Sequence, residues 1–213
     1  MLTFASGSWA DSYTKLLAFN QTEYDRVLSL DSDSTLLQIM DELFTLPSTP
    51  VAMPRAYWGS ADNRQLSSQV LLVEPSSEEF ARVNAAIKAA GPNTYDMEIV
   101  NDLYNEPCMV LPHRTYDLLT GEYRSKDHTK YLGNPVEDWN PERVLADAKF
   151  LHFSDWPVEK PWIKSDPRIV EAEQPECVER LGQNPDCRTR DMWLGFYSDF
   201  ARRRKEVCGM DLL

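Results

Sequence analysis

Two aspartates, Asp31 and Asp33, lie two residues apart directly after the apolar run VLSL at residues 27–30. Such a run is typical of a buried strand, which places both carboxylates where the strand ends and the chain turns. Carboxylates at this spacing can reach one hard divalent cation, and Mg²⁺ or Mn²⁺ sites usually add phosphate oxygens of a ligand to a few carboxylates. The pair therefore indicates a site for a metal ion and a diphosphate, with solvated turn aspartates as the alternative.

A calcium-binding loop is a second alternative for the same residues. Asp31, Asp33, Thr35 and Glu42 occupy positions one, three, five and twelve of an EF-hand spacing. Position six is Leu36, where the sharp turn of that loop needs glycine. Because the preceding residues also favour a strand over a helix, the sequence argues against a calcium sensor.

Helices and strands alternate along the chain. Apolar periodicity predicts helices at residues 8–24, 96–104 and 190–206, and one more that follows Ser76 and stops at Gly91. Apolar runs predict strands at residues 26–30, 69–73, 108–111 and 149–153. This order indicates an α/β sheet, and ligands of such sheets bind beyond the carboxyl ends of the strands, where Asp31 and Asp33 lie.

Two of the predicted helices carry further local signals. At the start of the second, we expect the Ser76 hydroxyl and the Glu79 carboxylate each to accept a hydrogen bond from a free backbone N–H, as in a capping box. The last helix carries an aromatic stripe that is typical of a core-facing side. The stripe consists of Trp193, Phe196, Tyr197 and Phe200.

The composition limits the class of protein. With 213 residues, 42% of them hydrophobic, the chain suits one domain of ordinary size, or a domain with a tail. Its formal net charge of -12 argues against a nucleic-acid or anionic-membrane partner, since both repel an acidic protein. The basic run at residues 202–205 is interpreted as a solvated helix end. The sequence shows no signal peptide, and no stretch approaches the roughly 20 apolar residues of a membrane span.

The cysteines indicate an oxidising compartment. Three of the four, Cys177, Cys187 and Cys208, lie in a Pro-rich, charged tail, and Cys108 precedes them. Disulfides are expected in the tail, although three pairings are possible; no C-x-x-C pair supports a zinc site. An N-glycosylation sequon at residues 20–22 also favours a secretory lumen.

Several ordered blocks resemble glycosyltransferase family 8, the glycogenin-like retaining enzymes, and most closely its fungal branch of Golgi N-acetylglucosaminyltransferases. The blocks are TKLLAFNQTEYDRVLSLDSDSTLLQIMDELF, SSQVLLVEPS, DMEIVNDLYN and LHFSDWPVEKPW. The resemblance runs from about Trp9 to Trp162 and implies a GT-A nucleotide-diphospho-sugar transferase fold, a Rossmann-like mixed sheet. It further implies UDP-GlcNAc as donor, a glycan acceptor, Mn²⁺ (or Mg²⁺) and a Golgi location.

The resemblance also implies roles for single residues. Asp31 and Asp33 match the D-x-D metal ligands, and His152 matches the histidine that completes the metal shell. Borderline imidazole together with hard carboxylates suits manganese. Lys160, in the KPW motif, matches the lysine that grips the diphosphate. The gap between His152 and Lys160 is two residues longer than in glycogenin, and the insertion HFSDWP fits the fungal branch. His113 and His128 are expected to be structural or surface residues.

Three residues match the donor side of the family site. Lys15 matches a lysine near the sugar phosphate. Asp96 matches the acidic start of a DQGVLN-type motif that holds the donor sugar, and it is also the nearest candidate for a catalytic nucleophile. Met97 replaces the glutamine of that motif. Ser68 lies in a segment that replaces an Asn-Ser-Gly-type motif, which makes it a weaker donor-site candidate.

The family's opening strand and uridine-binding loop have no counterpart in the sequence. We therefore expect an N-terminally truncated transferase that lacks the first strands. Residues 1–165 would form a partial GT-A catalytic domain, and residues 166–213 a cysteine-containing extension with a terminal helix. A membrane anchor is expected only in full-length relatives. The alternative is a non-catalytic luminal binding protein or a fragment. Donor sugar, acceptor and oligomeric state stay open.

Overall fold

The computed structural model describes residues 10–60, 64–179, 182 and 184–213. The chain forms two compact units, and each is described by itself. The first unit comprises Met1–Ser32 and Ile39–Tyr116, and the second comprises Asp33–Gln38 and Asp117–Leu213. A short early segment of the chain therefore belongs to the same unit as the C-terminal half.

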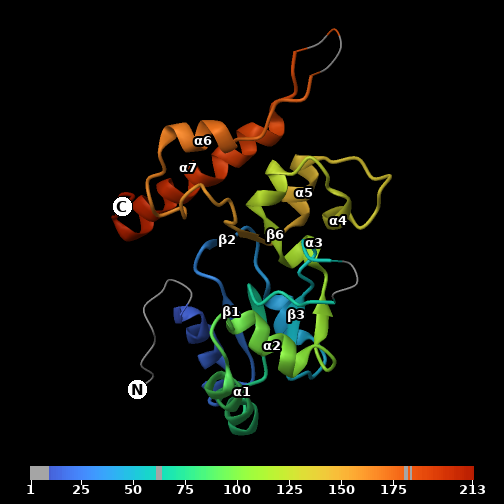
Figure 1. Cartoon of the computed structure of the whole chain (residues 1–213), viewed down its shortest axis with the longest axis vertical. Coiled ribbons are helices and arrows are strands. Elements are labelled where there is room, and N and C mark those ends of the chain that lie inside the picture. The colour runs from blue at the N-terminus through green and yellow to red at the C-terminus, as the bar shows by residue number, and fades with distance from the viewer. Residues whose placement is uncertain (1–9, 61–63, 180–181, 183) are drawn as a thin grey trace. The chain divides into compact units, whose positions relative to one another are not determined.

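The first unit is built on a four-stranded mixed sheet with the order β1-β4-β3-β5. Strands β1 and β3 of this sheet are labelled in Figure 1. Its strands are β1 (Val27–Leu30), β3 (Val51–Pro54), β4 (Val70–Val73) and β5 (Met109–Leu111). β4 pairs antiparallel with β1 and β3, while β3 pairs parallel with β5. All residues of β3 and β4 are buried, which explains why both strands are continuous apolar runs.

Helices of the first unit pack around this sheet. They are the 3₁₀ helices η1 (Ala10–Asn20) and η2 (Asp41–Thr45), with α1 (Ser77–Ala89), α2 (Asp96–Tyr104) and α3 (His113–Tyr116). η1 contacts α1, α2 and β1. Phe19 of η1 stacks on Tyr104 of α2 with ring centroids 5.4 Å apart, and both rings are fully buried. This core fixes η1 beside the strand that precedes Asp31.

One of the two hydrogen bonds predicted at the start of helix α1 is present. The Ser76 hydroxyl accepts a hydrogen bond from the Glu79 N–H at 3.1 Å. The prediction that the Glu79 carboxylate also accepts a hydrogen bond from a free backbone N–H is wrong. That carboxylate accepts hydrogen bonds from Arg82 at 2.8 Å and from the Tyr104 hydroxyl at 2.5 Å. A guanidinium one turn along and a phenol on the neighbouring helix provide it with stronger donors than the backbone.

The second unit contains a three-stranded sheet with the order β2-β7-β6. The strands are β2 (Ser34–Leu36), β6 (Leu118–Leu119) and β7 (Phe150–His152). β2 pairs antiparallel with β7, so that Ser34 lies opposite His152, and β6 pairs parallel with β7. This register places the residue before Ser34 beside the end of β7.

Helices of the second unit surround a set of aromatic side chains. The helices are η3 (Thr120–Arg124), α4 (Thr129–Leu132), α5 (Pro141–Asp147), α6 (Pro167–Glu173) and α7 (Arg188–Cys208), the last two orange to red in Figure 1. α7 packs against η3 and α5. Trp193 is fully buried, and Tyr197 and Phe200 contact Phe153 edge to face, with ring centroids 5.1 and 5.5 Å away. The aromatic stripe is core, as predicted.

Most predicted elements agree with the structure. The strands predicted at residues 26–30, 69–73, 108–111 and 149–153 correspond to β1, β4, β5 and β7. The helix predicted at residues 96–104 has the bounds of α2, and the helix predicted at residues 8–24 is the shorter 3₁₀ helix η1. Trp9, at the start of the resemblance, lies outside the described residues. Strands β2, β3 and β6 were not predicted.

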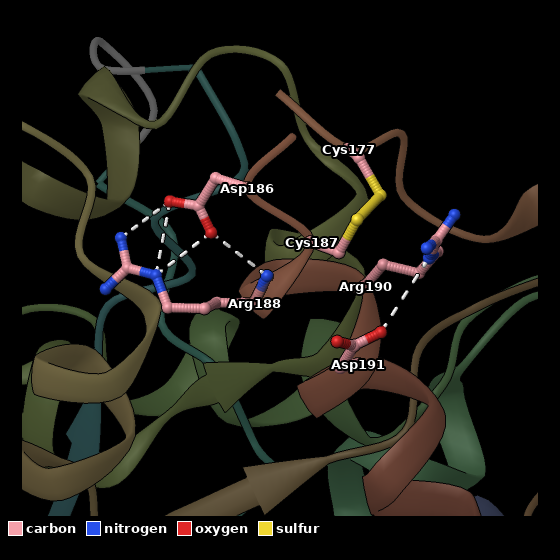
Figure 2. Close-up of a disulfide and its surroundings, with 6 residues drawn as sticks. All are labelled: Cys177, Asp186, Cys187, Arg188, Arg190 and Asp191. Atoms are coloured by element: carbon pink, nitrogen blue, oxygen red, sulfur yellow. Dashed lines mark hydrogen bonds and ion pairs between the residues drawn. A yellow bond between two sulfur atoms is a disulfide. The ribbon is translucent and has the colours of Figure 1, made fainter. Parts of the chain in front are cut away.

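A disulfide joins Cys177 to Cys187, which confirms the expectation of a disulfide in the tail. Between the two cysteines, Val178 and Asp186 form an antiparallel β-bridge. Figure 2 shows Asp186 beside the disulfide, paired with Arg188 at the start of α7 at 2.8 Å. Cys108 and Cys208 are free thiols, the first half-buried and the second exposed.

The predicted division at residue 165, between a partial catalytic domain and a C-terminal extension, stays a prediction. Among the described residues, no helix combines the length and apolarity needed to cross a bilayer.

Candidate metal and diphosphate site

In the first unit, Asp31 directly follows β1 and continues its ladder. The Asp31 N–H donates to the carbonyl of Gln69 at 3.0 Å, beyond the last pair of β1 and β4. The Asp31 carboxylate forms an ion pair with Lys15 of η1. The strand end therefore fixes the backbone of Asp31, and the adjacent helix provides the cation that balances its charge.

Lys15 also contacts the second carboxylate of this unit. Its Nζ lies 2.9 Å from Asp96 Oδ2 at the first residue of α2, and it donates to the carbonyl of Ser68 at 3.4 Å. The Ser68 hydroxyl donates to Asp96 Oδ2 at 2.6 Å, and the Ser12 hydroxyl accepts from the Asp96 N–H at 3.3 Å. Asp96 is buried, so its charge is balanced by these donors rather than by water. The structure thus gathers the four predicted site residues of this unit, Lys15, Asp31, Ser68 and Asp96.

The surroundings of Lys15 hold it in the charged form. Burial lowers the pKa of its ammonium group, but the negative charges of Asp31 and Asp96 outweigh burial and raise that pKa above its ordinary value. Lys15 is therefore a fixed cation held between two carboxylates at neutral pH.

In the second unit, Asp33 contacts both other predicted residues. His152 Nε2 lies 3.1 Å from Asp33 Oδ1, and Lys160 Nζ lies 2.5 Å from Asp33 Oδ2. The backbone holds the same arrangement, because the Phe153 N–H donates to the Asp33 carbonyl at 2.9 Å and Lys160 Nζ donates to the Phe153 carbonyl at 3.0 Å. The pairing of β2 with β7 thus positions Asp33, His152 and Lys160 together.

Asp33 is held as a carboxylate. Burial would raise its pKa, but the hydrogen bond and charge of His152, followed by those of Lys160, outweigh burial and hold the pKa well below its usual range. An ionised oxygen ligand beside an imidazole nitrogen is a suitable donor pair for a borderline cation such as Mn²⁺. The donor set of this unit therefore fits a divalent metal.

Chain connectivity links the two groups of residues. Asp31 precedes Asp33 by two residues, which limits the distance between their Cα atoms to about 7 Å.

The calcium-loop alternative does not fit the structure. Residues 27–30 are strand β1 rather than a helix, and Thr35 lies within strand β2.

The other two histidines contact aromatic rings. His113 stacks on Tyr57 with ring centroids 5.0 Å apart. His128 stacks on Trp139 at 3.8 Å, and its Nδ1 lies 2.7 Å from Glu122 Oε1. Both lie in packed environments, in keeping with the structural role expected for them.

Three residues near the site were missed by sequence reasoning. Asp155 is buried three residues after His152, and its Oδ2 accepts a hydrogen bond from the Tyr197 hydroxyl at 2.8 Å. The Arg124 guanidinium donates to the Asp155 carbonyl at 3.0 Å. The signal that could have found this group was the insertion HFSDWP, since an inserted segment beside a site must be anchored by partners from elsewhere in the chain.

Sequence comparisons show that the chain is similar to fungal transferases. No protein-family model matches it. It is 58% identical over 204 residues to glucose N-acetyltransferase 1 of Gibberella zeae, covering 94% of the chain and 44% of that relative. It is 48% identical over 216 residues to glucose N-acetyltransferase 1 of Aspergillus fumigatus, covering 94% of the chain and 55% of that relative. The chain is homologous to part of these fungal transferases. It spans about half of their length, and the predicted resemblance is confirmed.

Solved structures with the same fold are glycosyltransferases. The bifunctional glycosyltransferase WbbM superposes with a TM-score of 0.56 at 19% identity, over 78% of this chain and 35% of that one. The glycosyltransferase GlyE of Streptococcus pneumoniae gives 0.56 at 18% identity, over 94% of this chain and 47% of that one. The predicted GT-A fold is confirmed.

Proposed function

We propose that this chain carries the metal-binding and leaving-group residues of a retaining glycosyltransferase that moves N-acetylglucosamine from UDP-GlcNAc to a glycan acceptor. The observation that carries the proposal is the contact of Asp33 with both His152 and Lys160, which joins a metal-ligand pair to a cation suited to a diphosphate. The fungal relatives and the shared GT-A fold support the same activity.

In this proposal Mn²⁺ is held by Asp31, Asp33 and His152, the residues that match the metal ligands of the family, and Mg²⁺ is the alternative ion. When bound, the ion would neutralise negative charge on the departing UDP. Each unit already holds one ion pair of the proposed site. In the first unit Lys15 pairs with Asp31, and in the second unit Lys160 pairs with Asp33, so each carboxylate has its own ammonium group.

The two lysines would stabilise the leaving group as fixed point charges. A cation that is already in place costs no reorganisation when negative charge develops on the diphosphate. Lys160 is 43% exposed, which leaves its ammonium group open to an anion from solvent, whereas Lys15 is largely buried. Lys160 is therefore the better placed of the two to contact an incoming diphosphate.

Asp96 and Ser68 would orient the donor sugar. Asp96 Oδ2 already accepts from Ser68 and Lys15, so the carboxylate has a defined direction before any ligand binds. An oriented carboxylate can accept hydrogen bonds from sugar hydroxyls without first being ordered. Asp96 also remains the nearest candidate for a nucleophile in the first unit.

The proposal places the protein in the Golgi lumen. The disulfide between Cys177 and Cys187 is suited to an oxidising compartment. Asn20 of the predicted sequon is exposed at the end of η1, where a glycan would find space. Both observations favour a secretory location.

Calorimetry with UDP and Mn²⁺ tests the proposal. We expect UDP to bind in the presence of Mn²⁺ and not in the presence of EDTA, and Asp33→Asn to abolish the metal-dependent part. Asp25→Asn, at an exposed aspartate, is the matched control. Metal-independent UDP binding, or an unchanged affinity of Asp33→Asn, would contradict the proposed site.

Binding without transfer is a second candidate function. The chain spans about half of the length of its fungal relatives, so binding and turnover are measured separately. The assay is release of UDP from UDP-GlcNAc with Mn²⁺. Turnover above the rate of Asp33→Asn supports the transferase, and Mn²⁺-dependent binding without turnover supports the binding protein.

A further inference from the structure

The loop between His152 and Lys160 presents one large aromatic side chain to solvent. Both ends of this loop contact Asp33. Trp156 lies four residues from each end, and it is 84% exposed, although its neighbours Asp155 and Val158 are buried. The indole is thus displayed by a loop whose neighbouring side chains are packed.

The backbone on both sides of Trp156 is fixed by the rest of the second unit. Arg124 donates to the carbonyls of Asp155 at 3.0 Å and of Trp156 at 3.4 Å. The Tyr197 hydroxyl donates to the Asp155 side chain at 2.8 Å, and the Val158 N–H donates to the Asp155 carbonyl at 2.8 Å. A ligand that contacts Trp156 would therefore find the loop already ordered and would lose little binding energy to ordering it.

Exposure alone would mean little, because single exposed hydrophobic residues are common on protein surfaces. The position of Trp156 distinguishes it from such residues. The two residues that end its loop are those that contact Asp33, the centre of the proposed leaving-group site in this unit. Trp156 therefore belongs to a loop whose two ends are anchored at the proposed site.

A cavity in the same unit indicates the chemistry of the occupant. It has a volume of about 550 Å³ and is lined by charged side chains of both signs, among them Arg124, Lys126, Arg190, Glu171 and Glu176. Arg124 is shared, since it lines this cavity and also holds the backbone of Trp156.

Mixed charge favours a neutral ligand rich in hydroxyl groups. Hydroxyls can donate to the carboxylates and accept from the guanidinium and ammonium groups, whereas an anion or a cation would meet like charges. The C–H face of a sugar ring offers the apolar surface that an indole needs. A neutral oligosaccharide therefore suits both the exposed indole and the cavity.

We propose that Trp156 is the platform for the acceptor glycan, with its indole packed against one hexose ring and with further sugar residues of the same glycan in the cavity lined by Arg124. The inference rests on the proposed transferase function, of which it specifies the acceptor side. Because Trp156 would bind acceptor rather than donor, Trp156→Ala should weaken glycan binding and leave UDP binding unchanged.

The test measures glycan binding without donor or metal. The chain is labelled with 5-fluorotryptophan, the Trp156 signal is assigned from Trp156→Phe, and an array of neutral trisaccharides of glucose, mannose, galactose and N-acetylglucosamine is titrated by ¹⁹F NMR. We expect at least one trisaccharide to shift the Trp156 signal. Trp156→Ala should weaken its binding at least tenfold, and Trp156→Phe should weaken it less than threefold.

Two controls distinguish the possible outcomes. Val136→Ala removes an apolar side chain that is equally exposed, at 84%, and it should leave glycan binding unchanged. UDP binding with Mn²⁺ should be the same in Trp156→Ala and wild type. Unchanged glycan affinity in Trp156→Ala, or no trisaccharide that shifts the Trp156 signal, overturns the inference. If the wild type does not bind UDP in the presence of Mn²⁺, the proposed function is overturned instead. The two outcomes are distinguishable because the glycan titration contains neither UDP nor Mn²⁺.

Discussion

Replacement of Asp33 by asparagine should abolish stabilisation by Mn²⁺, and it should lower the free energy of unfolding of the metal-free protein by a smaller amount. The asparagine would keep the shape of the side chain and one oxygen that can accept a hydrogen bond from His152. It would lose the negative charge that His152 and Lys160 now share, at 3.1 and 2.5 Å. The variant therefore separates the charge of the site from its packing.

The metal-free cost follows from the two contacts. The His152 contact is nearly buried and is of the charge-assisted kind, which contributes about 1.5–3 kcal/mol. The Lys160 pair is 43% exposed, so water screens it to below about 1 kcal/mol. Because asparagine retains part of the first contact, we expect the free energy of unfolding to fall by about 1–2 kcal/mol.

In the wild type, Mn²⁺ should raise the free energy of unfolding, and by more than Asp33→Asn lowers it in the absence of metal. At a concentration one hundred times the dissociation constant, Mn²⁺ would add about 2.7 kcal/mol. For a chain of this size that corresponds to a rise in Tm of about 5–11 °C. Asp33→Asn should show almost none of this rise, and Asp25→Asn all of it. The assay is thermal unfolding by circular dichroism with and without MnCl₂; an Asp33→Asn protein that keeps the full Mn²⁺ shift would refute the metal assignment.

The same variant carries a pH signature. The pKa of Asp33 is lowered in the folded chain, so its stabilising contribution is fully present above the unfolded-state value of about 3.9 and is lost as pH falls toward the folded-state value. The metal-free difference between wild type and Asp33→Asn should hold constant above about pH 5 and shrink below about pH 4. Urea titrations at several pH values measure it. A difference that grows in acid would show that another group dominates.

Three further predictions concern other parts of the chain. Lys160→Met should slow release of UDP from UDP-GlcNAc by about 10²-fold because it removes a charge at the leaving group, whereas Lys164→Met at an exposed lysine should not; equal rates for the two variants would contradict the role of Lys160. Ser76→Ala should reduce the free energy of unfolding by about 1 kcal/mol in urea titrations, since the N-cap bond to α1 is lost; a change below the error would show that water replaces the cap. Burial raises the pKa of the Cys108 thiol to about 11, so at about pH 8 iodoacetamide should label Cys208 and leave Cys108 largely unmodified, as measured by mass spectrometry; rapid labelling of Cys108 would mean that this part of the first unit opens.

Much of the fold could be predicted from local pattern. β1 and β4 are short apolar runs, and α2 begins at Asp96 and ends at Tyr104 as the periodicity indicates. β3 was missed because its residues, Val51–Pro54, end on a proline, which argues against a strand inside a sheet. It nevertheless lies between β4 and β5, since Pro54 is the last residue of the strand.

The site was predictable only as far as family motifs reached. Lys15, Ser68 and Asp96 are far apart in sequence, and only the packing of η1 against α2 and β1 brings them together. Sequence spacing holds no information on such contacts. The hydrogen bonds from Arg124 to the loop around Trp156 could not be predicted from the sequence either, because an arginine that binds backbone carbonyls belongs to no recognisable motif.

The membership of residues 33–38 in the second unit has a consequence for how the chain is made. Strand β2 pairs with β7, whose residues are translated more than a hundred residues later. At ribosomal speeds of about 5–20 residues per second, β2 is therefore without its partner for roughly 6–23 seconds. During that interval an unpaired strand bearing Asp33 is open to chaperones and to other nascent chains. A message that stops before the codon for Phe150 would release a polypeptide in which β2 remains unpaired.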